Sequence, residues 1–147
     1  MTRSTVSYQI MWNRLISVVE EQAQALVRTA FSTSVREAGD LSAGVYNAHG
    51  EMLAQAEHIP VHLGAMGLCV RQLLDHRPMG PGDVVVTNHP AFGGSHLPDV
   101  TLAAPVHVDG RILGYVACRA HHAEIGGIRP GSVPPDATSL AEEGVVI

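Results

Sequence analysis

The strongest structural signal in the sequence is Val100-Thr-Leu-Ala-Ala-Pro-Val-His107, followed by Asp109-Gly110 and by Arg111-Ile-Leu-Gly-Tyr-Val-Ala-Cys118. Both flanking runs are apolar and contain β-branched residues, and Asp-Gly is a preferred pair for the type I′ turn of a two-residue hairpin loop. The stretch therefore predicts an antiparallel β-hairpin. Such a hairpin would bring the residues before its first strand beside the residues after its second strand.

The remaining sequence predicts helices and further strands around this hairpin. Apolar residues at alternating gaps of three and four indicate an amphipathic helix over residues 7–31. Two short apolar runs around Asn47-Ala-His-Gly50 suggest a second hairpin, residues 66–76 a short helix, and Asp83-Val-Val-Val-Thr87 a buried strand. Residues 125–136 are too rich in Gly and Pro for regular structure. The pattern indicates an α+β fold, with an N-terminal amphipathic helix followed by mixed helices and hairpins.

Composition narrows the classes of function. The chain has 147 residues, is 46% hydrophobic and carries a net charge of −5, which fits one soluble globular domain and, without a basic patch, argues against nucleic acid as a partner. Because it has no lysine, a P-loop lysine and a Schiff-base lysine are excluded within this chain. Cys69 and Cys118 indicate two buried thiols in a reducing compartment. With no evident signal peptide or membrane-spanning run, we expect a cytoplasmic protein without membrane contact.

Histidines and carboxylates gather on both sides of the predicted hairpin. Asn88-His-Pro-Ala-Phe-Gly-Gly-Ser-His-Leu-Pro-Asp99 precedes it, and Arg119-Ala-His-His-Ala-Glu124 follows it. Because the two ends of a hairpin meet, we expect His96 and Asp99 to lie close to His121 and His122 on loops at one end of the sheet. Such a set can bind Mn²⁺, Fe²⁺ or Zn²⁺ or move protons. A structural role for these histidines, as strand caps or partners of buried carbonyls, stays open.

A second histidine pair lies in His58-Ile-Pro-Val-His62. Pro60 excludes a helical zinc pair of the His-Glu-x-x-His kind, so a structural turn or the lining of a pocket fits this segment. We expect His49, in the second predicted turn, and His76, at a helix end, to be solvated. The sequence contains no nucleophile elbow, dinucleotide fingerprint or phosphate loop.

Four motifs in this order along the chain resemble the hydantoinase B family. They are His58-Ile-Pro-Val-His-Leu-Gly-Ala-Met66, Gly93-Gly-Ser-His-Leu-Pro-Asp99, Arg119-Ala-His-His-Ala-Glu-Ile-Gly-Gly127 and Pro130-Gly-Ser-Val-Pro-Pro-Asp136. The family includes N-methylhydantoinase B subunits, the C-terminal half of ATP-dependent 5-oxoprolinase and the large subunit of acetone carboxylase. Its members are several hundred residues long. The resemblance therefore implies that residues 1–147 are the truncated N-terminal part of a hydantoinase B-type domain.

The resemblance implies a subunit that takes part in ATP-dependent hydrolysis of a cyclic amide of the hydantoin or 5-oxoproline class. A hydantoinase A-type partner would bind ATP and phosphorylate the substrate. The resemblance also implies a divalent metal, manganese first with zinc or iron as alternatives, on Glu37, His96, Asp99 and His121. Glu37 lies in Val35-Arg-Glu-Ala-Gly-Asp40, where the family usually has Lys-Glu-Arg-x-Asp.

His122 and Glu124 are candidate proton-transfer groups beside these ligands. Three other functions remain open at this point. One is carboxylation of a ketone, as in acetone carboxylase, and another is hydrolysis of an amide without a metal. The third is a non-catalytic remnant that only binds a partner subunit.

Overall fold

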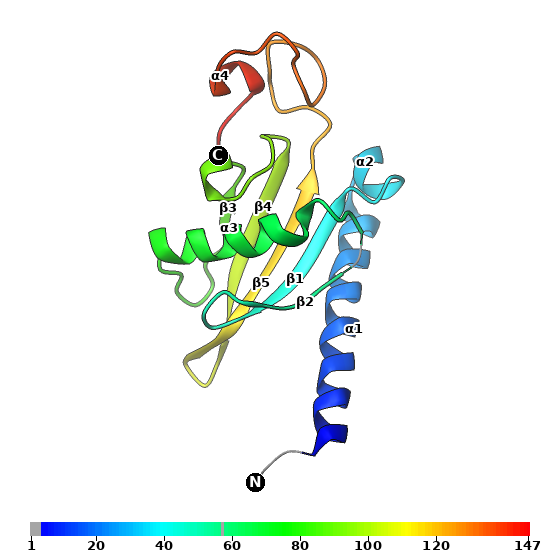
Figure 1. Ribbon diagram of the computed structural model, residues 1–147, viewed down its shortest axis with the longest axis vertical. Coiled ribbons are helices and arrows are strands. Elements are labelled where there is room, and N and C mark those ends of the chain that lie inside the picture. The colour runs from blue at the N-terminus through cyan, green and yellow to red at the C-terminus, as the bar shows by residue number, and fades with distance from the viewer. Residues whose placement is uncertain (1–3, 57) are drawn as a thin grey trace.

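The computed structural model describes residues 4–56 and 58–147, which form helices around one antiparallel sheet (Figure 1). The elements follow in the order α1 (Thr5–Thr29), α2 (Thr33–Arg36), β1 (Leu41–Asn47), β2 (Met52–Gln55), α3 (His62–His76), β3 (Val85–Thr87), the 3₁₀ helix η1 (Pro90–Phe92), β4 (Asp99–Val108), β5 (Arg111–His121) and α4 (Leu140–Glu143). The five strands lie in the order β2-β1-β5-β4-β3, and every neighbouring pair is antiparallel. The predicted α+β class is confirmed.

Strands β4 and β5 form the predicted central hairpin. Asp109 and Gly110 have φ values of 50° and 73°, both in the left-handed region that a type I′ turn requires. At the other end of the hairpin, Asp99 pairs directly with His121. The hairpin read from the sequence thus brings these two side chains to the same end of the sheet.

A β-bulge interrupts the hairpin near its turn. Val106 pairs with Gly114, but the next pair uses Ile112, so Leu113 is the extra residue on β5. Gly114 lies so close to β1 that a Cβ atom there would overlap the carbonyl oxygen of Tyr46. Only glycine fits this position of β5.

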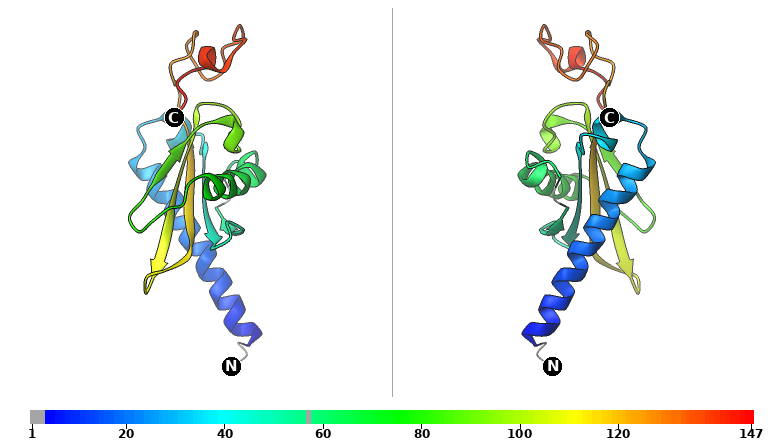
Figure 2. Two further views of the ribbon diagram at one scale, coloured as in Figure 1. Left: turned by 90° about the vertical axis from the view of Figure 1, so that its left-hand side faces the viewer. Right: turned by 90° about the vertical axis from the view of Figure 1, so that its right-hand side faces the viewer.

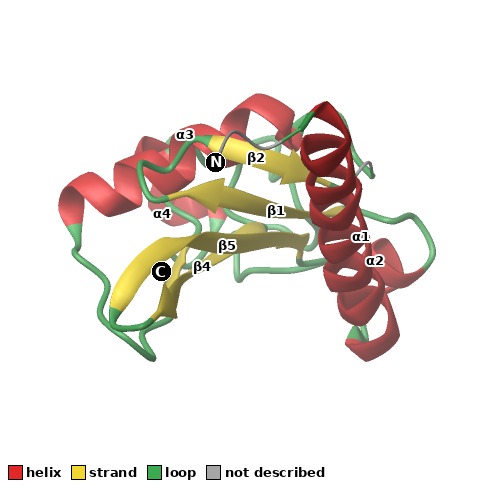
Figure 3. Cartoon of the chain, turned by 90° about the horizontal axis from the view of Figure 1, so that it is seen from below, coloured by secondary structure: helices red, strands yellow, loops and turns green. Residues whose placement is uncertain are grey.

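The two faces of the sheet are covered by different helices, as the edge-on views of Figure 2 show. Helix α3 packs on one face through a buried cluster that includes Tyr46, Met66, Cys69, Ala103 and Ala117. Helix α1 packs on the other face, beside β1 and β2 (Figure 3), through a second cluster that includes Val19, Ala23, Leu41, Ala43 and Ala54. Because successive strand residues point to opposite faces, β1 contributes to both clusters. Full burial of each large apolar side chain stabilises the fold by about 1.5–3 kcal/mol.

The predicted N-terminal helix is confirmed as α1. Its first turn is capped by Ser4, whose Oγ accepts a hydrogen bond from the Ser7 N–H at 3.3 Å. The N-terminal half of α1 extends past the sheet (Figure 1), where Tyr8 and Trp12 are exposed. Within residues 4–56 and 58–147, none of the helices combines the length and hydrophobicity needed to cross a bilayer.

The predicted hairpin around Asn47 is confirmed as β1 and β2. Two other elements differ from their predictions. The run predicted as a buried strand gives β3, a short strand at the sheet edge in which Val86 is 42% exposed. β-Branched residues favour a strand whether it is central or at an edge, so burial did not follow from composition. Helix α3 begins at His62 rather than Met66, because a turn closed by the Leu63 N–H and the Pro60 carbonyl leads directly into it.

Candidate metal centre

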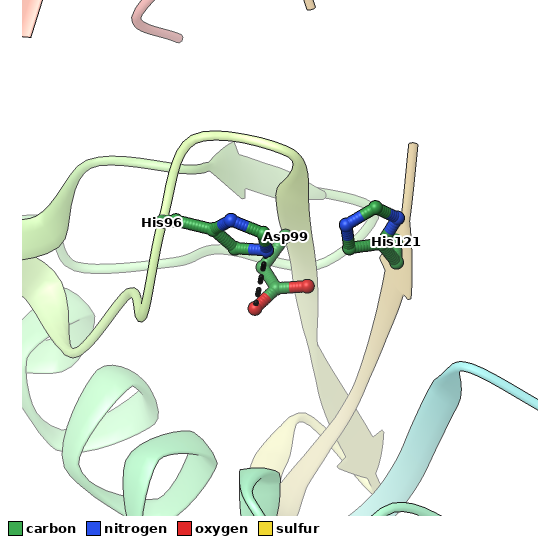
Figure 4. Close-up of side chains that lie close together, drawn as sticks. All are labelled: His96, Asp99 and His121. Atoms are coloured by element: carbon green, nitrogen blue, oxygen red, sulfur yellow. Dashed lines mark ion pairs between the residues drawn. The ribbon is translucent and has the colours of Figure 1, made fainter. Parts of the chain in front are cut away.

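Three predicted side chains converge where β5 ends and β4 begins. Asp99 and His121 are opposite each other in the sheet, and His96 comes from the loop before β4. Figure 4 shows the three side chains gathered at this point. His96 Nε2 lies 3.6 Å from Asp99 Oδ2, and the rings of His96 and His121 have centroids 5.0 Å apart. The structure therefore brings together His96, Asp99 and His121, as the hairpin argument expected.

Two further side chains reach the same place from α3 and from the loop before β1. His62, the first residue of α3, is 1% exposed, and its Nε2 lies 3.4 Å from Asp99 Oδ2. Its other ring nitrogen, Nδ1, lies 3.0 Å from Ser42 Oγ, so one hydrogen bond orients the ring. Asp40 Oδ2 lies 4.0 Å from His121 Nδ1. Neither His62 nor Asp40 was identified as a ligand from the sequence.

Asp99 belongs to two overlapping groups of atoms that could hold a metal ion. The ligand atoms within each group lie within 4.8 Å of one another, and the groups are His96, Asp99 and His121, and Asp40, His62 and Asp99. Two buried atoms here, Asp99 Oδ1 and His121 Nδ1, have no hydrogen-bond partner among the described residues. A buried polar atom without a partner is unfavourable, and a bound cation would satisfy such atoms. Imidazole nitrogens with carboxylate oxygens suit Mn²⁺, Fe²⁺ or Zn²⁺.

The electrostatic environment keeps Asp99 ionised. Burial by itself would raise the pKa of this carboxyl group, but hydrogen bonds from His62 and Ser95 and the charges of His62 and His96 lower the pKa to about 2. The Ser95 hydroxyl donates to Asp99 Oδ2. Asp99 is therefore a carboxylate at neutral pH, the form that a cation requires.

Backbone hydrogen bonds fix the segments that carry these side chains. The His121 N–H donates to the Asp40 carbonyl at 3.1 Å, and the His122 N–H donates to the Pro98 carbonyl at 2.8 Å. The end of β5 is thus tied on one side to the loop before β1 and on the other to the loop before β4. Ligands held in this way lose little conformational freedom on binding a cation.

Arg119 ties the loop that carries His96 to β5. Its guanidinium is fully buried, with Nε 2.7 Å from Thr101 Oγ1 and Nη2 3.0 Å from the carbonyl oxygen of Gly93. None of the ion pairs among the described residues involves Arg119. Gly93 also lies against α3, where a Cβ atom would stand 2.8 Å from the Cys69 nitrogen. Strand and helix together hold the loop in place.

Glu37 lies outside both groups. It is exposed at the C-terminal cap of α2, where its N–H donates to the Thr33 carbonyl at 2.9 Å. Asp40, three residues later in the same loop, joins one of the groups instead. Glu37 caps the short helix α2, which the sequence did not predict, whereas Asp40 directly precedes β1.

His122 and Glu124 also lie outside both groups, and both are exposed. Glu124 Oε1 accepts hydrogen bonds from the backbone N–H groups of Ile125 and Gly126, and its Oε2 accepts one from Gly131. These donors, Gly131 and Gly126 foremost, lower the pKa of Glu124. In this arrangement Glu124 organises the loop that follows β5.

The cluster opens into a pocket of about 440 Å³, a volume within the range of small-molecule sites. The pocket is lined by Asp40, Ile59, Val61, His62, Ser95, His96, Asp99 and His121. A small substrate could therefore reach the atoms that would hold a cation.

Comparisons with known proteins agree on one family. The family described as hydantoinase B/oxoprolinase matches residues 4–147. The protein named 5-oxoprolinase 1 of Arabidopsis thaliana is 45% identical over 97% of this chain, which is 11% of the relative. The ATP-dependent caprolactamase structure from Pseudomonas jessenii gives a TM-score of 0.85 at 26% identity, covering 100% of this chain and 26% of its own. The nucleotide-free acetone carboxylase gives 0.81 at 26% identity, covering 88% of this chain and 18% of its own.

Proposed function

The chain belongs to the hydantoinase B/oxoprolinase family, and from this premise we propose that it takes part in ATP-dependent hydrolysis of a cyclic amide at a divalent metal ion. The substrate would be of the hydantoin or 5-oxoproline class. The observation that carries the proposal is the convergence of three histidines and two aspartates on one pocket, with Asp99 at its centre. Relatives named 5-oxoprolinase and caprolactamase support a ring amide as the substrate.

We assign the metal to His96, Asp99 and His121, with Asp40 or His62 completing the set. Asp40 takes the place that the family resemblance gave to Glu37, because Glu37 lies outside both groups. Manganese fits this donor set, as do zinc and iron. When bound, the ion would polarise a carbonyl group or activate a water molecule. Ser42, whose hydroxyl oxygen lies 3.0 Å from His62 Nδ1, would orient that imidazole ring for coordination.

We propose His122 as the proton-transfer group of this site. His122 and Glu124 stay predicted proton-transfer groups, and neither lines the pocket. Because the oxygens of Glu124 already accept backbone hydrogen bonds, we favour His122 of the two.

ATP would be used by a partner subunit of the hydantoinase A type. The chain has no lysine and no phosphate-binding loop with which to hold a nucleotide in the usual way. A relative named caprolactamase subunit beta supports an assembly of different subunits. Because the chain spans only 11% of the Arabidopsis relative, a complete activity requires that partner and the further segments that relatives contain.

A second candidate function is carboxylation of a ketone. The likeness to acetone carboxylase, with a TM-score of 0.81, favours it. The two candidates differ in the substrate that triggers ATP consumption by the reconstituted complex. A cyclic amide does so in the first, and a ketone with bicarbonate does so in the second.

Metal analysis tests the central part of the proposal. The purified chain, incubated with Mn²⁺ and then desalted, should retain about one equivalent of metal, and His96→Ala and Asp99→Asn should lose it. His49→Ala, in the exposed turn after β1, is the matched control and should retain the metal. Absence of stoichiometric metal from the native chain, or retention by both site variants, would contradict the proposed centre.

A further inference from the structure

A second cavity adjoins the pocket of the metal centre. It has a volume of about 380 Å³ and is lined by Gln55, Ala56, His58, Ile59, Pro60 and Leu63. Ile59 lines both this cavity, which we call the ring pocket, and the pocket that contains Asp99. A ligand in the ring pocket would therefore lie beside the pocket of the candidate metal centre.

Two side chains that line the ring pocket each carry a buried polar atom without a partner. These are the side-chain oxygen of Gln55 and Nε2 of His58, neither of which has a hydrogen-bond partner among the described residues. Gln55 is the last residue of β2, and His58 follows in the segment that leads to α3. The amide oxygen can only accept a hydrogen bond, and the imidazole nitrogen donates one in one of its tautomers. The other lining side chains are apolar.

A secondary amide within a small ring offers the complementary pair of groups. Ring closure holds the amide cis, so that its N–H and its C=O lie on the same edge, whereas open-chain amides are trans and direct these groups to opposite sides. The ring N–H would donate to the Gln55 oxygen, and the ring carbonyl would accept from His58 Nε2. The methylene groups would contact Ala56, Ile59 and Leu63.

We propose that the ring pocket recognises the cyclic amide before its activation, with Gln55 and His58 as the residues that determine specificity. They select ring amides with a free N–H over N-alkylated rings and over open-chain amides. This inference rests on the proposed function, because a ring amide is relevant here only if its hydrolysis takes place next to Ile59. It adds to that function a location for the ring and a reason why the ring form is chosen.

Three small amides test the proposed selectivity. The isotope-labelled 147-residue chain, kept metal-free with a chelator, is titrated with 2-pyrrolidinone, N-methyl-2-pyrrolidinone and open-chain N-methylpropanamide, while NMR follows the Gln55 side-chain amide and the His58 ring. We expect saturable shifts at both residues with 2-pyrrolidinone. The other two amides should bind about fivefold to tenfold more weakly, since each loses one hydrogen bond.

Variants then test the two residues themselves. Gln55→Leu and His58→Phe should each weaken 2-pyrrolidinone binding about fivefold or more and remove its advantage over the N-methyl compound. Gln24→Leu on the exposed side of α1 and His49→Phe are matched controls and should leave both unchanged. Should a pocket variant fail to fold, the comparison of the three amides on the native chain still decides.

The test of the ring pocket can be distinguished from the test of the metal centre, because manganese stoichiometry is measured on the same variants. Loss of 2-pyrrolidinone selectivity with manganese retained supports the ring pocket. Equal affinity for all three amides, or native affinity in both pocket variants, overturns it and leaves the metal centre standing. Selective binding of 2-pyrrolidinone by a chain that retains no manganese supports the ring pocket while contradicting the centre.

Discussion

Replacing Asp99 with asparagine should remove a pH-dependent part of the protein's free energy of unfolding. The pKa of Asp99 is lowered from 3.8 to about 2 in the folded chain. A lowered pKa means that the ionised group stabilises the fold above its unfolded pKa, near 3.9, and that this contribution disappears as the pH falls through the folded value. Asparagine cannot ionise, so the variant lacks this dependence.

The magnitude follows from the size of the shift. The pKa of Asp99 is almost two units below its ordinary value, and each unit corresponds to about 1.4 kcal/mol, so the contribution is about 2 kcal/mol. Asp99 is only 3% exposed, so solvent screening removes little of it.

The assay is urea unfolding of the native chain and Asp99→Asn at several pH values between 5 and 2, with a chelator present to keep cations out. The stability advantage of the native chain should shrink by about 2 kcal/mol over this range. Asp75→Asn, at an exposed position of α3, is the control and should run parallel to the native chain. Parallel curves for the native chain and Asp99→Asn would refute the electrostatic description of the cluster.

Three further predictions test the scaffold around the centre. Gly114→Ala should destabilise the chain by about 3 kcal/mol or more in urea unfolding, because its Cβ would meet the Tyr46 carbonyl, whereas Gly64→Ala, with open space around it in α3, should be neutral or stabilising by up to about 1 kcal/mol. Arg119→Lys should weaken manganese binding about tenfold by calorimetry, since an ammonium group cannot serve both acceptors of the guanidinium. Glu124→Ala should speed proteolysis of the loop after β5 without changing the metal content, because four backbone N–H groups lose their acceptor.

The sequence predicted best those elements whose signals are local. The periodicity of α1, the Asp-Gly turn of the central hairpin and the Asn47 turn each lie within one short segment, and each element formed close to its predicted position. Local signals of this kind could not predict the order of the strands in the sheet. The pairing of β1 with β5 joins residues about 70 positions apart, such as Val45 with Val116, and depends on how α1 and α3 pack on the two faces.

The residues of the candidate site show the same difference between local and long-range signals. His96, Asp99 and His121 could be placed together because Asp99 and His121 lie at the two ends of one hairpin and His96 is in the loop that leads into it. Asp40 arrives through the pairing of β1 with β5, and His62 arrives through the docking of α3, so neither could be identified by spacing along the chain. Pro60 correctly excluded a helical pair with His58, but it did not reveal that the helix starting just after it would carry His62 to Asp99.

The bulge at Leu113 governs which residue faces Asp99 at the opposite end of the hairpin. Next to the turn, Val108 pairs with Arg111, and the same register continued without the extra residue would set Asp99 opposite Ala120. His121 would then point to the face covered by α1, away from His62. Leu113 is exposed, lies far along the strand and makes no contact with the centre. It nevertheless determines which side chains of β5 point toward the face that carries the centre. The hairpin can vary at its turn, but an unpaired residue between the bulge and His121 would dismantle the ligand set without altering any ligand.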